Sequence, residues 1–245
     1  MKKLTLILGG LVLGAAVMLL PNTGKATIIG SKHDFSSYTN YWIGGVAGGD
    51  FAVGHGSTNV CGECHTIHHA PDPARGPLWI HTPTAQTFKT YDQSGSETFP
   101  SGVTVTLGSS SKACLGCHDG TVAVNSQDAL SQGAITTTLN GGSPVYIAPS
   151  AIVIEVNGGQ DDLTHMHPIG VNYASCQAAL PAGDLNAIGT AFNAPGSPTV
   201  GNVLKSGNVE CSSCHDIHRT LGGSMTSGIY TVASGQNLCL GCHNK

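Results

Sequence analysis

One five-residue pattern, Cys-x-x-Cys-His, occurs four times and contains eight of the nine cysteines of the chain. Two thiols at this spacing can form thioethers with the two vinyl groups of one haem, and the adjacent imidazole can then bind the iron as an axial ligand. We therefore expect four covalently attached c-type haems. The attaching cysteines are Cys61, Cys64, Cys114, Cys117, Cys211, Cys214, Cys239 and Cys242, and the axial histidines are His65, His118, His215 and His243.

Disulfides and zinc sites are the alternative interpretations of so many cysteines. Neither of them explains a histidine directly after every second cysteine. The ninth cysteine, Cys176, has no thiol partner once the other eight form thioethers. We expect it to be a buried thiol, with an intermolecular disulfide as the minority alternative.

Residues 1–26 have the three-part layout of a secretory signal peptide. Met1-Lys2-Lys3 is positively charged, residues 4–20 form an apolar run of 17 residues, and Gly24 and Ala26 are small residues before a cleavage point. An uncleaved membrane anchor is the alternative, because the apolar run approaches the length that spans a bilayer. Export agrees with haem attachment outside the cytoplasmic membrane. We expect an extracellular or cell-surface protein, with the periplasm as the alternative.

Residues 27–245 are too poor in apolar helical sequence to build a large core from side chains alone. The chain has only 5% aromatic and 10% charged residues and contains 34 glycines, which lose much conformational entropy on folding. We therefore expect one loop-rich domain with short helices at the haem motifs, a few short strands such as 103–107 and 151–156, and a core formed by four stacked haems. The predicted parts of the domain are a haem pair in 61–118, an interval in 119–210 and a second haem pair in 211–243.

The domain that follows the signal peptide is acidic. Without Lys2, Lys3 and Lys25, residues 27–245 carry seven basic residues against 14 acidic ones, a formal charge of −7. Haem propionates add further negative charge. This balance argues against a nucleic-acid partner and favours cationic or metal-bearing partners. It also disfavours a reductase for nitrite or a similar oxyanion, since such an enzyme needs cationic groups beside an open haem.

Eight histidines outside the motif positions are candidates for the sixth ligand of each iron. His68 and His218 each follow a motif histidine by three residues, too few to reach the opposite face of the same haem, so each must serve another haem or none. Pro168 favours an extended backbone at His167, which projects that ring clear of the local chain. His33 lies far from every motif and is a further candidate. The reserve candidates are His55, His69, His81 and His165.

The two haem pairs have the same internal order. In each, a Cys-x-x-Cys-His-x-x-His site precedes a Cys-Leu-Gly-Cys-His site, which indicates an internal duplication. Only Asn244 and Lys245 follow the last motif in this sequence. We therefore expect the fourth haem to lie near the surface.

The chain resembles the doubled Cys-x-x-Cys-His family of multihaem cytochromes. The resemblance is carried by residues 31–34, 114–121 and 167–173 together with the paired motifs. More narrowly, the arrangement is similar to that of tetrahaem outer-surface cytochromes of metal-reducing microbes that polymerise into conductive filaments. This resemblance implies bis-histidine ligation of all four haems, a continuous haem stack and, in filament-forming members, one distal histidine donated across the subunit boundary. Carried over to this chain, the distal ligands are His33, His68, His167 and His218.

Enough candidate histidines are present to close the sixth position of every iron, and a closed haem exchanges electrons without binding a substrate. We therefore expect an electron-transfer protein rather than an enzyme, acting as an extracellular conduit that polymerises into a filament. Its expected acceptors are other redox proteins, metal oxides or electrodes, and no stable membrane span is expected after signal cleavage. The alternatives are a soluble periplasmic tetrahaem shuttle and a small multihaem oxyanion reductase.

Overall fold

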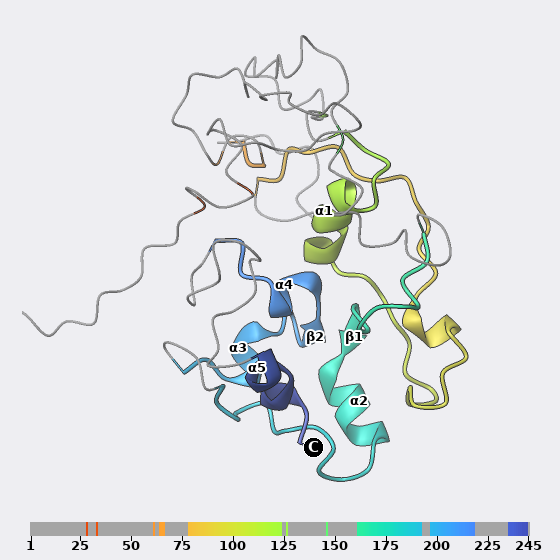
Figure 1. Cartoon of the computed structure of the whole chain (residues 1–245), viewed down its shortest axis with the longest axis vertical. Helices are drawn as coiled ribbons and strands as arrows, with labels where there is room; N and C mark the ends of the chain where they lie inside the picture. Colours follow the sequence, from red (N-terminus) through yellow and green to blue (C-terminus); the bar gives the residue numbers. More distant parts are fainter. Residues whose placement is uncertain are drawn as a thin grey trace, which may run out of the picture.

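The structure is a computed structural model of the chain (Figure 1). It describes residues 28, 33, 61, 64–66, 78–123, 126, 146, 161–192, 197–218 and 235–244. The expected signal peptide, residues 1–26, and the expected strand 151–156 lie outside the described residues.

The helices are short, and three of them contain haem motifs. They are α1 (Ser109–His118), α2 (Tyr173–Ala179), α3 (Val200–Val203), α4 (Cys211–Cys214) and α5 (Gly235–Cys242), with a 3-10 turn η3 at Tyr91–Gln93. Helical geometry suits a Cys-x-x-Cys pair because residues three positions apart lie on the same helix face. None of the helices among the described residues has the length and apolar character needed to cross a membrane.

One two-stranded antiparallel sheet connects distant parts of the chain. Strand β1 (Val171–Asn172) pairs with β2 (Asn208–Val209), with Val171 opposite Val209. The expected strand at 103–107 was wrong: this segment forms only an isolated bridge, from Val105 to Val171. A longer ladder cannot form, because the partner strand β1 ends after two residues, where α2 begins. Gly170 has a positive φ of 77°, and a Cβ there would meet the Thr106 backbone at 2.8 Å, so this close approach requires glycine.

The buried side chains form small clusters beside the motif helices rather than one large core. The first cluster contains Tyr173, Phe192, Val200, Val203 and Leu204; the second contains Leu107, Leu115, Leu163 and Ile169; the third contains Val103, Val171 and Cys176. The side chain of Cys242 packs against the first cluster and that of Cys211 against the second. Cys176 is buried, as expected. The clusters therefore position motif cysteines as well as stabilising the fold.

The central packing contact joins two motif helices. Helix α4 contacts both α1 and α3, so it lies between the second motif and the first apolar cluster (Figure 1). The third motif is therefore placed next to the second by tertiary packing.

Candidate haem sites

The second and third motifs meet through their cysteines. The thiol of Cys114 on α1 and the thiol of Cys211 on α4 share a hydrogen bond. This bond lowers the pKa of Cys211 to about 7 and raises the pKa of Cys114 well above its usual value. Cysteines of two different motifs are thus in direct contact.

The first and fourth motifs adjoin this central pair. Loss of solvent raises the pKa of the Cys117 thiol to about 12, and the neighbouring Cys64 of the first motif adds to the effect. Loss of solvent likewise raises the pKa of Cys242 to about 11, with contributions from Cys214 and Cys239. The fourth motif therefore lies beside the third, and all four motifs belong to one group.

Residues 78–82 hold the first motif by backbone pairing. The Thr66 amide donates to the Leu78 carbonyl at 2.8 Å, and the Ile80 amide donates to the Cys64 carbonyl at 3.0 Å. Between these two bonds the ring of Trp79 lies edge-on to that of His65, with centroids 5.7 Å apart. Backbone pairing and an aromatic contact thus orient the His65 imidazole.

The same segment supports the second motif through His81. This buried ring has Nδ1 2.8 Å from the Thr82 carbonyl oxygen and Nε2 3.0 Å from the Ala123 carbonyl oxygen. Its Nε2 also lies 3.3 Å from the Cys117 sulfur. Gly116 lies directly behind this ring, and a Cβ there would lie 3.4 Å from His81 Nδ1. The ring of the reserve ligand His81 is therefore in contact with a cysteine of the second motif.

Two polar side chains satisfy the last carbonyls of the fourth motif, which ends a helix and so lacks intrahelical donors. The Asn186 side chain donates to the carbonyls of Leu240 at 2.9 Å and Gly241 at 3.1 Å. The Cys242 carbonyl accepts from the Asn186 amide at 2.8 Å and from the Tyr173 hydroxyl at 3.1 Å. The fourth motif is thus held by the α2 region, far away in the sequence.

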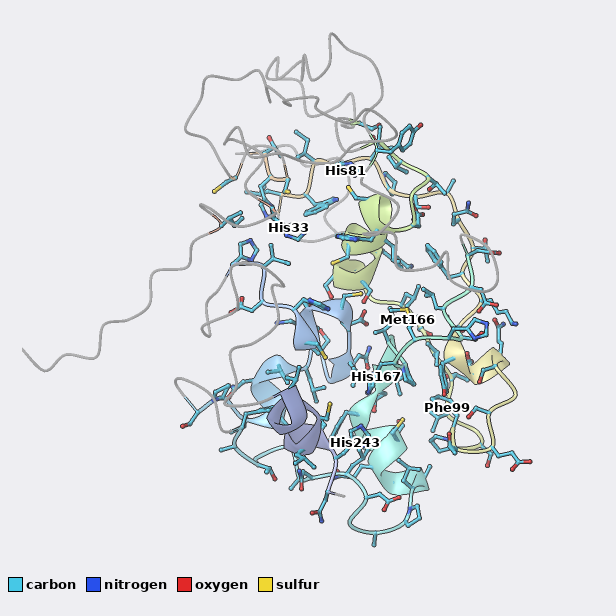
Figure 2. The ribbon with its side chains drawn as sticks, in the orientation of Figure 1. His33, His81, Phe99, Met166, His167 and His243 are labelled. Carbon is cyan, nitrogen blue, oxygen red and sulfur yellow. The ribbon has the colours of Figure 1, made fainter. Side chains whose placement is uncertain are left out.

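Three motif histidines each face a histidine from outside the motif positions. His167 faces His243 with ring centroids 6.2 Å apart (Figure 2). The other two pairs are His33 with His118 and His65 with His218, each with ring centroids 6.1 Å apart.

These distances are those expected for two ligands on opposite sides of one metal. A metal–imidazole nitrogen bond is about 2.0–2.1 Å and the ring centre lies roughly 1.1 Å behind the nitrogen, so the two centres should be about 6.3 Å apart. The interplanar angles of 42°, 31° and 74° are all compatible, because each ring can rotate about its own bond to the metal. The ring separations therefore leave room for an iron between the two rings of each pair.

Two of these histidines have surroundings that suit metal binding. The Nδ1 of His167 lies 3.0 Å from the Pro168 carbonyl, which only accepts, so Nδ1 carries the proton and Nε2 is left for a metal. Loss of solvent, followed by the neighbouring imidazoles of His118, His215 and His218, lowers the pKa of His33 to about 4. His33 is therefore neutral near pH 7, which is the form that binds metals.

The structure says little of the remaining candidates. His68, which was expected to serve another haem or none, lies outside the described residues, as do the reserve candidates His55 and His69. His165 is exposed, and its Nε2 lies 4.0 Å from a carboxylate oxygen of Asp162.

Sequence reasoning missed the role of Glu210. This residue is 1% exposed, and its carboxylate accepts hydrogen bonds from the start of α1. The available signal was its position directly before Cys211, where it is the N-cap residue of α4. Beside His118, the buried Oδ2 atom of Asp119 has no hydrogen-bond partner among the described residues, which leaves a polar contact open at the second motif.

Residues 202–245, which contain the third and fourth motifs, match the protein family described as "Doubled CXXCH motif". The match supports a multihaem c-type cytochrome-like protein. It implies covalent binding of haem c and a role in electron transfer for this cytochrome-like chain. Comparison with curated proteins gave no match.

Proposed function

We propose that this cytochrome-like chain is a tetrahaem electron-transfer protein in which histidine closes both faces of every haem. The observation that carries the proposal is the set of three ring pairs with centroids 6.1–6.2 Å apart. His118 is then paired with His33, His65 with His218 and His243 with His167. His68 is assigned to His215, because it follows the first motif as His218 follows the third.

The exchange of histidines between the first and third motifs brings two haems together. His218 lies only three positions after His215, a length of chain that spans at most about 10 Å. The haem attached at the third motif must therefore lie next to the haem whose iron His218 would bind. Together with the Cys114–Cys211 hydrogen bond between the second and third motifs, this favours a core of four closely packed haems through which electrons pass between neighbouring haem edges.

An electron-transfer role is favoured over catalysis because both axial positions of each iron would be taken by side chains. Reduction of an oxyanion needs an open position on one iron. The proposed ligand set contains no open position, so the function depends on the spacing and reduction potentials of the haems.

We further propose that the protein is exported and exchanges electrons through its fourth haem. Cys239 and Leu240 of the fourth motif are exposed, so a haem attached there would be accessible to a partner. The proposed partner is a second copy of the chain in a filament, with redox proteins or metal oxides as acceptors, and this choice rests on the family resemblance. The three ring pairs form within one chain, so filament subunits would be joined by haem contacts or by residues outside the described part. The soluble periplasmic shuttle is the alternative.

The ligand assignment is tested with His167→Ala and His218→Ala, studied in the haem-loaded protein by electron paramagnetic resonance and carbon monoxide binding. Each substitution should convert one haem in four from the six-coordinate low-spin form to a form that binds carbon monoxide. His165→Ala, which removes an exposed histidine two residues from His167, is the matched control and should leave all haems low-spin. Fully low-spin spectra in His167→Ala with four haems attached would contradict the assignment.

The filament is tested separately by electron microscopy of the secreted, haem-loaded protein. Filaments whose repeat equals one tetrahaem subunit would support the conduit. Monomers at all concentrations, with low-spin spectra, would contradict the filament and leave the shuttle.

A further inference from the structure

A buried carboxylate connects the second and third haem motifs. Glu210 accepts a hydrogen bond from the Gly108 amide at 2.9 Å and another from the Ser111 hydroxyl. Both donors belong to the start of α1, the helix that carries Cys114 and Cys117. Glu210 itself directly precedes Cys211, the first cysteine of the third motif.

Further hydrogen bonds close this connection into a network. The Cys211 amide donates to the Ser111 hydroxyl oxygen at 3.0 Å, and the Glu210 amide donates to the Ser213 hydroxyl oxygen at 2.9 Å. The hydroxyls of Ser212 and Ser110 are 3.2 Å apart across the same contact. The relative position of α1 and α4, and hence of the two haem attachments, thus depends on Glu210 and its donors.

The carboxylate of Glu210 is held by hydrogen-bond donors at the start of α1. An amide and a hydroxyl both donate to the carboxylate, and the start of a helix carries partial positive charge. Among the residues that the structure describes, Glu210 has no ion-pair partner. The carboxylate is therefore buried among hydrogen-bond donors, and no ion pair from the described residues reaches it.

The carboxylate of Glu210 lies close to the third motif. Glu210 directly precedes Cys211, and the Ser111 hydroxyl that donates to its carboxylate also accepts from the Cys211 amide. The other buried carboxylates among the described residues, Asp119 and Asp216, each follow the histidine of the second or third motif. All the buried acidic side chains in the described part of the chain therefore adjoin these two motifs.

We propose that Glu210 is a positioning residue that joins the second and third haem sites and lowers the reduction potential of the haems attached there. This inference rests on the proposed attachment of haem at both motifs. Reduction adds one electron to a ferric iron and no proton, so a fixed negative charge in a low-dielectric interior stabilises the ferric form over the ferrous form. The second and third haems then form a low-potential pair relative to the first and fourth.

The test is Glu210→Gln in the haem-loaded protein, studied by spectroelectrochemical titration at a fixed pH near 7. We expect the reduction equilibrium constant of at least one haem to rise at least threefold, a shift of about 28 mV for a one-electron couple. Glu97→Gln removes the same charge at an exposed site and should leave every potential unchanged. Unshifted potentials in Glu210→Gln, with four haems attached by mass spectrometry, would overturn the inference.

A second variant, Ser111→Ala, distinguishes the effect of the carboxylate's charge from the effect of packing between α1 and α4. It also provides a test if Glu210→Gln does not take up haem. It removes one donor from the network and keeps the carboxylate, so no potential should rise. A rise in potential in Ser111→Ala would show that loosened packing sets the potentials, which would overturn the inference. Loss of haem from the second or third motif of the unmodified protein would instead contradict the proposed function.

Discussion

Two copies of the same five residues, Cys-Leu-Gly-Cys-His, have opposite environments in this molecule. In the second motif Leu115 is 1% exposed, whereas in the fourth motif the equivalent Leu240 is 45% exposed. The glycines also differ in their neighbours. Gly116 faces His81 and the Thr82 carbonyl, while Gly241 lies against the ring of Phe192.

The difference shows that the motif specifies local geometry and that its surroundings are set by distant segments. Leu115 packs with Leu107, which precedes the second motif, and with Leu163 and Ile169 from the interval between the haem pairs. Leu240 has its backbone carbonyl bound by Asn186, but its side chain faces solvent. An interior site suits a relay haem, and an exposed site suits exchange with a partner.

The largest expected effect distinguishes the two leucines. Leu115→Ala should lower the free energy of unfolding by about 2–5 kcal/mol, because it leaves a cavity among buried side chains. Leu240→Ala should change it by less than about 0.5 kcal/mol, since the side chain is largely exposed. Guanidinium unfolding of the haem-loaded variants measures both. Equal losses would show that the two motifs are equally buried.

Substitution of the two motif glycines should destabilise the fourth motif more than the second, the reverse of the order for the leucines. A Cβ at position 241 would overlap the buried Phe192 ring, so Gly241→Ala should cost about 1–3 kcal/mol through overpacking. A Cβ at position 116 would lie no closer than 3.3 Å to its neighbours, so Gly116→Ala should cost less. Thermal unfolding of both variants tests this order, and a Phe192→Leu substitution added to Gly241→Ala should recover part of the loss.

The smallest expected effect concerns the support of the fourth motif alone. The Tyr173 hydroxyl donates to the carbonyls of Asn186 at 2.9 Å and Cys242 at 3.1 Å. Tyr173→Phe should cost about 0.5–1.5 kcal/mol, the net value of a typical hydrogen bond. Hydrogen exchange should become faster for the Asn186 amide, which donates to Cys242, and stay unchanged for the amides of α1. Faster exchange in α1 as well would show that the two sites are not independent.

Local sequence predicted much of the candidate site but little of the fold. The thiol spacing and the motif histidines could be recognised because they depend on a single turn of chain, and Pro168 pointed to His167 for the same local reason. The strand expected at 103–107 failed because alternation of apolar residues does not reveal how long the partner strand is. The Glu210 network was missed because its donors lie about a hundred positions away in the sequence.

The sequence by itself determined the chemistry available to this protein: the four paired thiols, the adjacent imidazoles and an acidic, glycine-rich chain with few aromatic side chains. Only the tertiary structure decided which histidine faces which motif, which of two identical motifs is buried and where an unpaired carboxylate is placed. The physical reason is the distance along the chain over which each feature is set. Thioether spacing is set within five residues, whereas ring pairs, burial and buried charge depend on packing between segments far apart in the chain.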